Sequence, residues 1–196
     1  VITVLPGSRL GEISRLGGVF GKTIKLLKKK FPGLHVVVPS VASVASTVLG
    51  LTAGWPQRVI VIEGEAEKFD AFAAADVALA ASGTVALELA LARTPAVIAY
   101  KSTPLTWFLV RRLIKIRFAH LVNLILDRQA IPEFLQGNCR ADVIAAAIKG
   151  LLADPGLRDK QIEAYDEALK QLRPEGRSPA ERAAEAVLGL MAGKEQ

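Results

Sequence analysis

Cysteine and histidine are scarce in this chain: one cysteine and two histidines occur among 196 residues. The single Cys139 excludes an internal disulfide and is consistent with a reducing compartment. His35 and His120 are far apart in the sequence, so they and the cysteine do not form the clustered ligand pattern of a zinc site. We therefore expect neither a disulfide nor a bound metal ion.

Long unbroken apolar runs are also missing, and we expect neither a membrane-spanning segment nor a secretory signal. Hydrophobic residues still make up 51% of the chain, enough to fill the core of one domain of this length. The chain opens on the strand-like VITVL without an initiator methionine, so we expect a piece of a longer protein. The net charge of +6 favours an anionic partner such as a nucleotide, a nucleic acid or a membrane surface.

Short apolar runs alternate with longer amphipathic segments. The runs are rich in small and β-branched residues and are apolar on both faces, as buried parallel strands are; they span 1–5, 35–39, 58–64, 76–82 and 96–101. Helical length and period mark the segments between them, such as 12–30, 41–53 and 83–92. This alternation predicts an α/β fold, a Rossmann-like parallel sheet with helices on both faces.

The last part of the chain, 141–196, contains only helical patterns, at 141–154, 157–172 and 178–191. No internal repeat and no low-complexity tract divides the chain. We therefore predict a single domain over 1–196 that ends in a helical C-terminal segment.

The stretch GGVFGKT (17–23) resembles the end of a nucleotide-binding phosphate loop. Such a loop needs four residues between its glycines, whereas Gly17 and Gly21 are separated by three and Leu16 stands where a glycine is required. The stretch also lies inside a predicted helix, where backbone N–H groups are already used. We interpret it as a helix surface whose small residues allow close packing.

A better phosphate site is LPGSRLGE (5–12), which follows the first predicted strand and leads into the first helix. Gly7 makes a tight turn with the preceding proline, Ser8 is placed to cap the helix, and Glu12 lies in its first turn. The N–H groups at a helix start attract anions, and Arg9 adds a guanidinium suited to phosphate oxygens. The alternative is an ordinary capped turn with a solvated arginine.

A second loop of this kind is AASGTVALELAL (80–91). Ser82, Gly83 and Thr84 are small residues between a strand and a helix, where a phosphate can approach the backbone closely. Glu88 lies one turn further on the same helix face as Thr84 and is suited to hold a ribose diol, or simply to pair with a base. Both loops leave the carboxyl ends of parallel strands, which is the usual ligand edge of such sheets.

A third stretch, 102–126, combines apolar, aromatic and basic residues. Its predicted helix at 104–117 contains Trp107 and a basic cluster that includes Arg111 and Arg112. This pattern fits an interfacial membrane contact and equally an ordinary helix half-buried in the core. No nucleic-acid motif accompanies the basic residues, so we expect no nucleic-acid partner.

Four stretches in this order resemble lipid-A-disaccharide synthases: VLPGSRLGEI (4–13), ASGTVALELAL (81–91), PAVIAYK (95–101) and PEFLQ (132–136). The resemblance covers nearly the whole chain but only the C-terminal half of such an enzyme. It implies the donor-binding domain of a GT-B glycosyltransferase, with the N-terminal domain missing.

The resemblance further implies transfer of a sugar from UDP-2,3-diacylglucosamine to 2,3-diacylglucosamine 1-phosphate, with inversion and without a tightly bound metal. It implies a peripheral enzyme at the cytoplasmic face of the inner membrane, with the 104–117 helix touching the membrane surface. A homodimer is compatible with the face that the missing domain would leave exposed. Because the general base is expected on the missing half, the chain alone should be inactive.

The resemblance assigns roles to individual residues. Arg9 would bind the donor diphosphate and stabilise the leaving group, on a loop shaped by Gly7 and Ser8. Ser82, Gly83 and Thr84 would also hold the diphosphate, and Glu88 the ribose.

Asn123 matches an asparagine near the family's reaction centre, although Val122 replaces the proline usual there. Gln129, Glu133 and Gln136 follow the same loop and are further candidates for lining the cleft.

Two other classes of function remain open from the residues alone. Another GT-B enzyme that uses a UDP-sugar, either a transferase or a UDP-N-acetylglucosamine epimerase, would share both loops. A non-catalytic nucleotide-sugar-binding or membrane-docking module would share them too. The apolar and basic helix at 104–117 favours an enzyme of lipid substrates, because an enzyme of soluble substrates has less need for such a helix.

Overall fold

A computed structural model describes residues 1–56, 58–103, 107, 112, 117–172 and 179–192. A six-stranded sheet forms its centre, with every neighbouring pair parallel and the order β3-β2-β1-β4-β5-β6. The strands are β1 (Ile2–Leu5), β2 (Val36–Ser40), β3 (Val59–Glu63), β4 (Val77–Ala81), β5 (Ala96–Tyr100) and β6 (Glu133–Leu135). The strand order changes direction between β1 and β4, which brings the loops after these two strands together at the ligand edge of the sheet.

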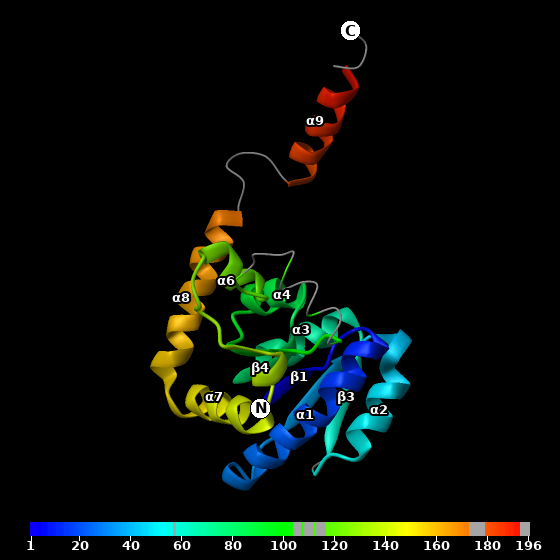
Figure 1. Ribbon diagram of the computed structural model, residues 1–196, viewed down its shortest axis with the longest axis vertical. Coiled ribbons are helices and arrows are strands. Elements are labelled where there is room, and N and C mark those ends of the chain that lie inside the picture. Colours follow the sequence, from blue (N-terminus) through cyan, green and yellow to red (C-terminus); the bar gives the residue numbers. More distant parts are fainter. Residues whose placement is uncertain (57, 104–106, 108–111, 113–116, 173–178, 193–196) are drawn as a thin grey trace.

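Helices cover both faces of this sheet (Figure 1). Their bounds are α1 (Leu10–Lys30), α2 (Ala45–Ala53), α3 (Glu65–Ala74), α4 (Val85–Leu91), α6 (Leu121–Leu126), α7 (Ala141–Ala153), α8 (Pro155–Leu172) and α9 (Pro179–Ala192), with short 3-10 turns at Ala42–Val44 and Gln136–Asn138. The predicted α/β fold with helices on both faces and a helical C-terminal segment is confirmed.

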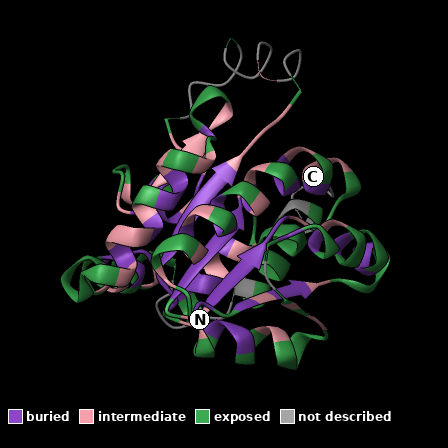
Figure 2. Ribbon diagram, turned by 90° about the horizontal axis from the view of Figure 1, so that it is seen from below, coloured by how far each residue is buried: buried purple, intermediate pink, exposed green. Residues whose placement is uncertain are grey.

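The core is divided between the two faces by the alternation of strand side chains. Val77 and Leu79 of β4 pack with α1, α2 and α7, whereas Ala78 and Ala80 pack with α3, α4, α6 and α8. Figure 2 shows the central strands buried between the two layers. The small β4 side chains on the second face leave room for Tyr165 of α8, which is fully buried and donates its hydroxyl proton to the Thr94 carbonyl at 3.1 Å.

The stretch that resembles a phosphate loop lies within α1, as expected. A Cβ on Gly17 would lie 2.5 Å from Leu51 Cδ2, and one on Gly21 would lie 2.8 Å from Trp55 Nε1. The glycines therefore allow α1 to pack closely against the α2 region, and Thr23 donates its hydroxyl proton to the Val19 carbonyl of its own helix at 2.9 Å. The close-packing interpretation of GGVFGKT is confirmed.

We expect Gly17→Ala to lower the free energy of unfolding by about 1–2 kcal/mol, because the new methyl group overpacks the contact with Leu51. Gly18→Ala is the matched control on the same helix. Gly18 is exposed and a Cβ there meets nothing within 4 Å, so alanine should raise stability by about 0.5–1 kcal/mol. Urea denaturation of the two variants tests this, and equal effects of both would contradict the packing argument.

Strand β6 and the position of helix α9 were not predicted from the sequence. The short edge strand β6 was not among the predicted strands; it pairs with β5 through Ile98–Glu133, Ala99–Phe134 and Tyr100–Leu135. Helix α9 lies beyond the end of α8, apart from the sheet, with side chains such as Val187 and Met191 exposed (Figure 1). Most of the helix predicted at 104–117 lies outside the described residues.

Candidate functional site

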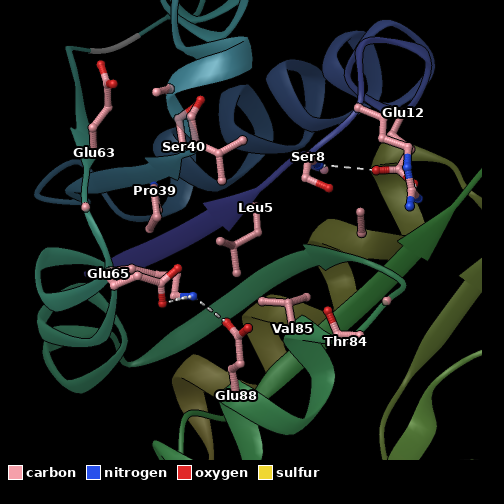
Figure 3. Close-up of a pocket in the computed structure, with 18 of the residues that line it drawn as sticks. Leu5, Ser8, Glu12, Pro39, Ser40, Glu63, Glu65, Thr84, Val85 and Glu88 are labelled. Atoms are coloured by element: carbon pink, nitrogen blue, oxygen red, sulfur yellow. Dashed lines mark hydrogen bonds and ion pairs between the residues drawn. The ribbon is translucent and has the colours of Figure 1, made fainter.

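A cleft of about 680 Å³ opens at the carboxyl edge of the sheet, where β1, β2, β3 and β4 end (Figure 3). Both predicted phosphate loops line it, together with the loops after β2 and β3. Its lining residues are Leu5, Gly7, Ser8, Arg9, Glu12, Pro39, Ser40, Val41, Ala42, Glu63, Gly64, Glu65, Lys68, Ala81, Ser82, Gly83, Thr84, Val85 and Glu88. The structure thus brings together all seven residues that the sequence assigned to nucleotide-sugar binding.

In the first loop, the carboxylate of Glu12 lies at the start of α1. The Glu12 carboxylate accepts the Ser8 backbone N–H at 3.2 Å and lies 3.4 Å from the Arg9 guanidinium. The helix N-cap is Arg9, whose side chain makes no capping hydrogen bond to the helix backbone, so the prediction that Ser8 caps α1 was wrong. Of the first-turn N–H groups, that of Glu12 donates to the Arg9 carbonyl at 3.0 Å. The first N–H groups of a helix otherwise have no acceptor within the helix and attract anions.

Gly7 adopts a backbone conformation that other residues rarely take, with φ of +117°. A Cβ on Gly7 would also lie 2.5 Å from Glu12 Oε2 and 2.7 Å from Glu12 Cβ. A glycine is therefore required for the loop to turn under the Glu12 side chain. This agrees with the expectation of a tight turn at the end of the first strand.

The second loop, Ser82 to Thr84, lies between β4 and α4. The Ser82 hydroxyl donates its only proton to the Ala119 carbonyl at 2.8 Å, so in this arrangement it has only acceptor capacity left. Gly83 and Thr84 are exposed at the cleft. Donors for an anion on this loop are therefore the backbone N–H groups and the Thr84 hydroxyl, rather than the Ser82 hydroxyl.

Glu88 lies on the same wall as Thr84, and its side chain is partly exposed. Its carboxylate accepts from Lys68 Nζ at 2.9 Å, and the same ammonium lies 2.8 Å from Glu65 Oε2. Burial disfavours the charge on Lys68, but pairing with the two glutamates outweighs burial and raises the pKa of Lys68. Figure 3 shows the Glu65 and Glu88 carboxylates turned towards one another.

Sequence reasoning missed the segments after β2 and β3, including Lys68 on α3. The rule that carboxyl ends of parallel strands share an edge would have placed the loops after the predicted strands 35–39 and 58–64 at the same cleft. Along the described lining, four carboxylates (Glu12, Glu63, Glu65 and Glu88) outnumber the two cations, Arg9 and Lys68.

Asn123, predicted as a catalytic residue, is fully buried and does not line the cleft. Its amide donates to the Ile131 carbonyl at 2.8 Å and to Glu133 Oε1 at 2.6 Å, and its oxygen accepts from the N–H groups of Ala130 at 2.9 Å and Ile131 at 2.8 Å. All four of its hydrogen-bonding positions are thus used within the protein. The geometry does not support a catalytic role in this arrangement and gives Asn123 a structural one.

Glu133 and Gln136 are also structural here rather than cleft-lining. Glu133 Oε2 accepts the backbone N–H groups of Ala119 at 2.7 Å and His120 at 3.2 Å, and Gln136 Nε2 donates to Ser102 Oγ at 2.6 Å. Gln129 does not line the cleft either. Glu133 therefore bonds the backbone at the start of the 119–123 segment, and the Ala119 carbonyl of that segment accepts the Ser82 hydroxyl proton.

His120 is fully buried, and neither ring nitrogen has a hydrogen-bond partner in the described part of the chain. Burial without a partner disfavours the charged imidazolium and lowers the pKa of His120 to about 4. At neutral pH the side chain is therefore a neutral core residue. Among the described residues, no three His, Cys, Asp or Glu side chains lie close enough together to hold a metal ion. No helix in the described ranges has the length and apolar character of a membrane span.

The fold is that of the C-terminal domain of GT-B glycosyltransferases. One solved neighbour is a variant of TarM from S. aureus in complex with ligands that include UDP, with a TM-score of 0.63, 13% identity, and coverage of 96% of this chain and 35% of that one. Another is the C-terminal domain of a group 1 glycosyl transferase (LpcC) from Francisella tularensis, with a TM-score of 0.55, 15% identity, and coverage of 87% and 84%.

Sequence comparison gives the family. A lipid-A-disaccharide synthase of Rhodospirillum centenum is 49% identical over 191 residues, which cover 97% of this chain and 48% of the relative. The chain thus spans about half the length of the curated relative it matches. The family model described as lipid-A-disaccharide synthetase matches residues 1–187, which include both cleft loops, so the chain belongs to that family of glycosyltransferases.

Proposed function

We propose that this chain is the donor-binding half of a lipid-A-disaccharide synthase and that its cleft binds UDP-2,3-diacylglucosamine. The observation that carries the proposal is the meeting of the Gly7–Arg9 loop, the Ser82–Thr84 loop and Glu88 in one cleft. The first two offer N–H groups, a guanidinium and a hydroxyl to a diphosphate, and the third offers a carboxylate to a ribose diol.

In this proposal Arg9 contacts the donor diphosphate both before and during the transfer. Its side chain is 80% exposed and its pair with Glu12 is long, at 3.4 Å, so little holds the guanidinium away from a bound anion. As the bond between sugar and phosphate breaks, UDP gains negative charge. Donors already placed at that position stabilise the transition state, and without a tightly bound metal Arg9 and the loop N–H groups supply them.

The acceptor in this proposal is 2,3-diacylglucosamine 1-phosphate, and the transfer inverts the anomeric centre. The attacking hydroxyl of the acceptor needs a general base within hydrogen-bonding reach. We assign that base and most of the acceptor site to the N-terminal half of the enzyme. The chain alone is therefore expected to bind UDP without transferring sugar.

The acyl chains of both substrates favour work at a membrane surface, and in this proposal that surface is the cytoplasmic face of the inner membrane. The basic, aromatic-bearing segment 104–117 supplies the membrane contact in this proposal. Liposome flotation of the chain with anionic vesicles, compared with an Arg111/Arg112 double alanine variant, tests it. If the parent chain and the variant float equally well, or if neither floats, segment 104–117 does not supply the membrane contact.

We expect Arg9→Ala to weaken UDP binding by roughly 10- to 150-fold, the equivalent of about 1.5–3 kcal/mol for a hydrogen bond to a charged group. Isothermal titration with UDP, ADP and GDP measures this. Arg93→Ala is the matched control, because Arg93 is an exposed arginine that pairs with Asp166 and does not line the cleft. Equal UDP affinity of Arg9→Ala and the parent chain would remove Arg9 from the donor site.

A further inference from the structure

Lys68 is the cation of the donor cleft that the sequence did not single out. It lies on α3, the helix that follows β3, and its side chain is only 17% exposed. Its Nζ lies 5.1 Å from the centroid of the Phe69 ring, and its ammonium bridges Glu65 and Glu88 at 2.8 and 2.9 Å. A long, charged side chain held this closely is unusual at a protein surface, where lysine normally keeps its head in water.

The bridge joins two different walls of the cleft. Glu65 and Lys68 belong to α3 on the side of β3, whereas Glu88 belongs to α4 on the side of β4. Without the ammonium, the two carboxylates turned towards one another would repel, and Glu88 would move away from the α3 wall into open solvent. With it, Glu88 Oε2 is bonded to Lys68 Nζ at 2.9 Å, which favours the orientation in which the carboxylate lies at the cleft.

We propose that Lys68 is a positioning residue, which orients the Glu88 carboxylate so that both of its oxygens accept the two hydroxyls of the donor ribose. The inference rests on the proposed donor site and extends it by one residue. A carboxylate oxygen has two lone-pair directions, so Glu88 Oε2 accepts from Lys68 and still has room for a ribose hydroxyl. The conformational entropy of the Glu88 side chain is then lost when the protein folds rather than when the nucleotide binds.

The readout must separate orientation of Glu88 from general attraction of Lys68 for a diphosphate. The ratio of the dissociation constants of 2′-deoxy-UDP and UDP does so, because both ligands carry the same diphosphate and differ only in one ribose hydroxyl. A site built to bond that hydroxyl should prefer UDP by on the order of 10-fold or more. Loss of a distant charge would weaken both ligands equally and leave the ratio unchanged.

The experiment is isothermal titration of the chain with both nucleotides in four variants. Lys68→Met keeps the length and removes the charge, and should reduce the ratio to about one, at least a 5-fold fall. Lys68→Arg restores an ion pair with Glu88 and should recover most of the ratio. Lys160→Met is the matched control and should keep the ratio of the parent chain, because Lys160 is an exposed lysine of α8 that does not line the cleft.

Glu88→Ala separates this inference from the proposed function. If Glu88→Ala keeps the preference for UDP over 2′-deoxy-UDP, Glu88 does not hold the ribose, and the donor site as proposed and the role of Lys68 are both wrong. If Glu88→Ala abolishes the preference while Lys68→Met keeps it, only the role of Lys68 is wrong. Loss of the preference in both, with recovery in Lys68→Arg, supports the proposal and also shows that the fold tolerates the changed position.

Discussion

Replacing Asn123 with alanine is expected to lower the free energy of unfolding by roughly 3–5 kcal/mol. The truncation removes four hydrogen bonds of 2.6–2.9 Å from a fully buried site. The buried N–H and carbonyl of Ile131 and the Glu133 carboxylate then lose this partner, and a buried polar group without a hydrogen bond is costly. Because a domain of this kind is stable by only about 5–15 kcal/mol, the loss is a large fraction of the total.

The control for this prediction is Asn138→Ala, which truncates an exposed asparagine and should change stability by less than about 0.5 kcal/mol. Asn123→Asp is a sharper variant. Its carboxylate still accepts from Ala130 and Ile131, but it cannot donate to the Ile131 carbonyl and stands against Glu133, so it should destabilise as well. Urea denaturation measures all three, and an Asn123→Ala variant as stable as Asn138→Ala would contradict the structural role.

The fold and the Gly7 and Gly83 loops of the cleft could be predicted from local sequence patterns. Runs such as 76–82 are apolar on both faces, and only a strand covered on two sides satisfies that pattern, so the parallel sheet and its helix layers were predictable. The Gly7 and Gly83 loops were recognisable because small residues between a strand and a helix mark a close backbone approach. Since every such loop in a parallel sheet leaves the same edge, their meeting in one cleft was predictable as well.

The features that were missed depend on contacts between distant segments. β6 has three residues, and its strand character comes from pairing with β5 rather than from a pattern of its own. The partner of Ser82 is 37 residues away, and the two glutamates of Lys68 come from two helices. The catalytic role of Asn123 was implied only by its match to an asparagine of the family's motif, and nothing in the neighbouring residues reveals that Ala130, Ile131 and Glu133 satisfy its hydrogen bonds.

Lowering the pH is expected to destabilise the chain through His120. Its pKa of about 4 in the folded state lies below the usual 6.5, so the unfolded chain binds more protons between these two values. The stability that depends on the neutral imidazole is complete above pH 6.5 and is lost as the pH falls towards 4. At 1.36 kcal/mol for each unit, the loss amounts to about 2 kcal/mol at pH 5 and about 3 kcal/mol at pH 4.

Comparison with His120→Leu isolates this contribution, because carboxylates also titrate in the same range. The ring nitrogens have no partner in the described structure, so leucine replaces them without breaking a hydrogen bond and should leave stability at pH 7.5 nearly unchanged. Between pH 7 and 5, the free energy of unfolding of His120→Leu should therefore fall by about 2 kcal/mol less than that of the parent chain. Parallel pH profiles of the parent and His120→Leu would mean that His120 accepts a proton in the folded state, which requires the 119–123 segment to open and admit water.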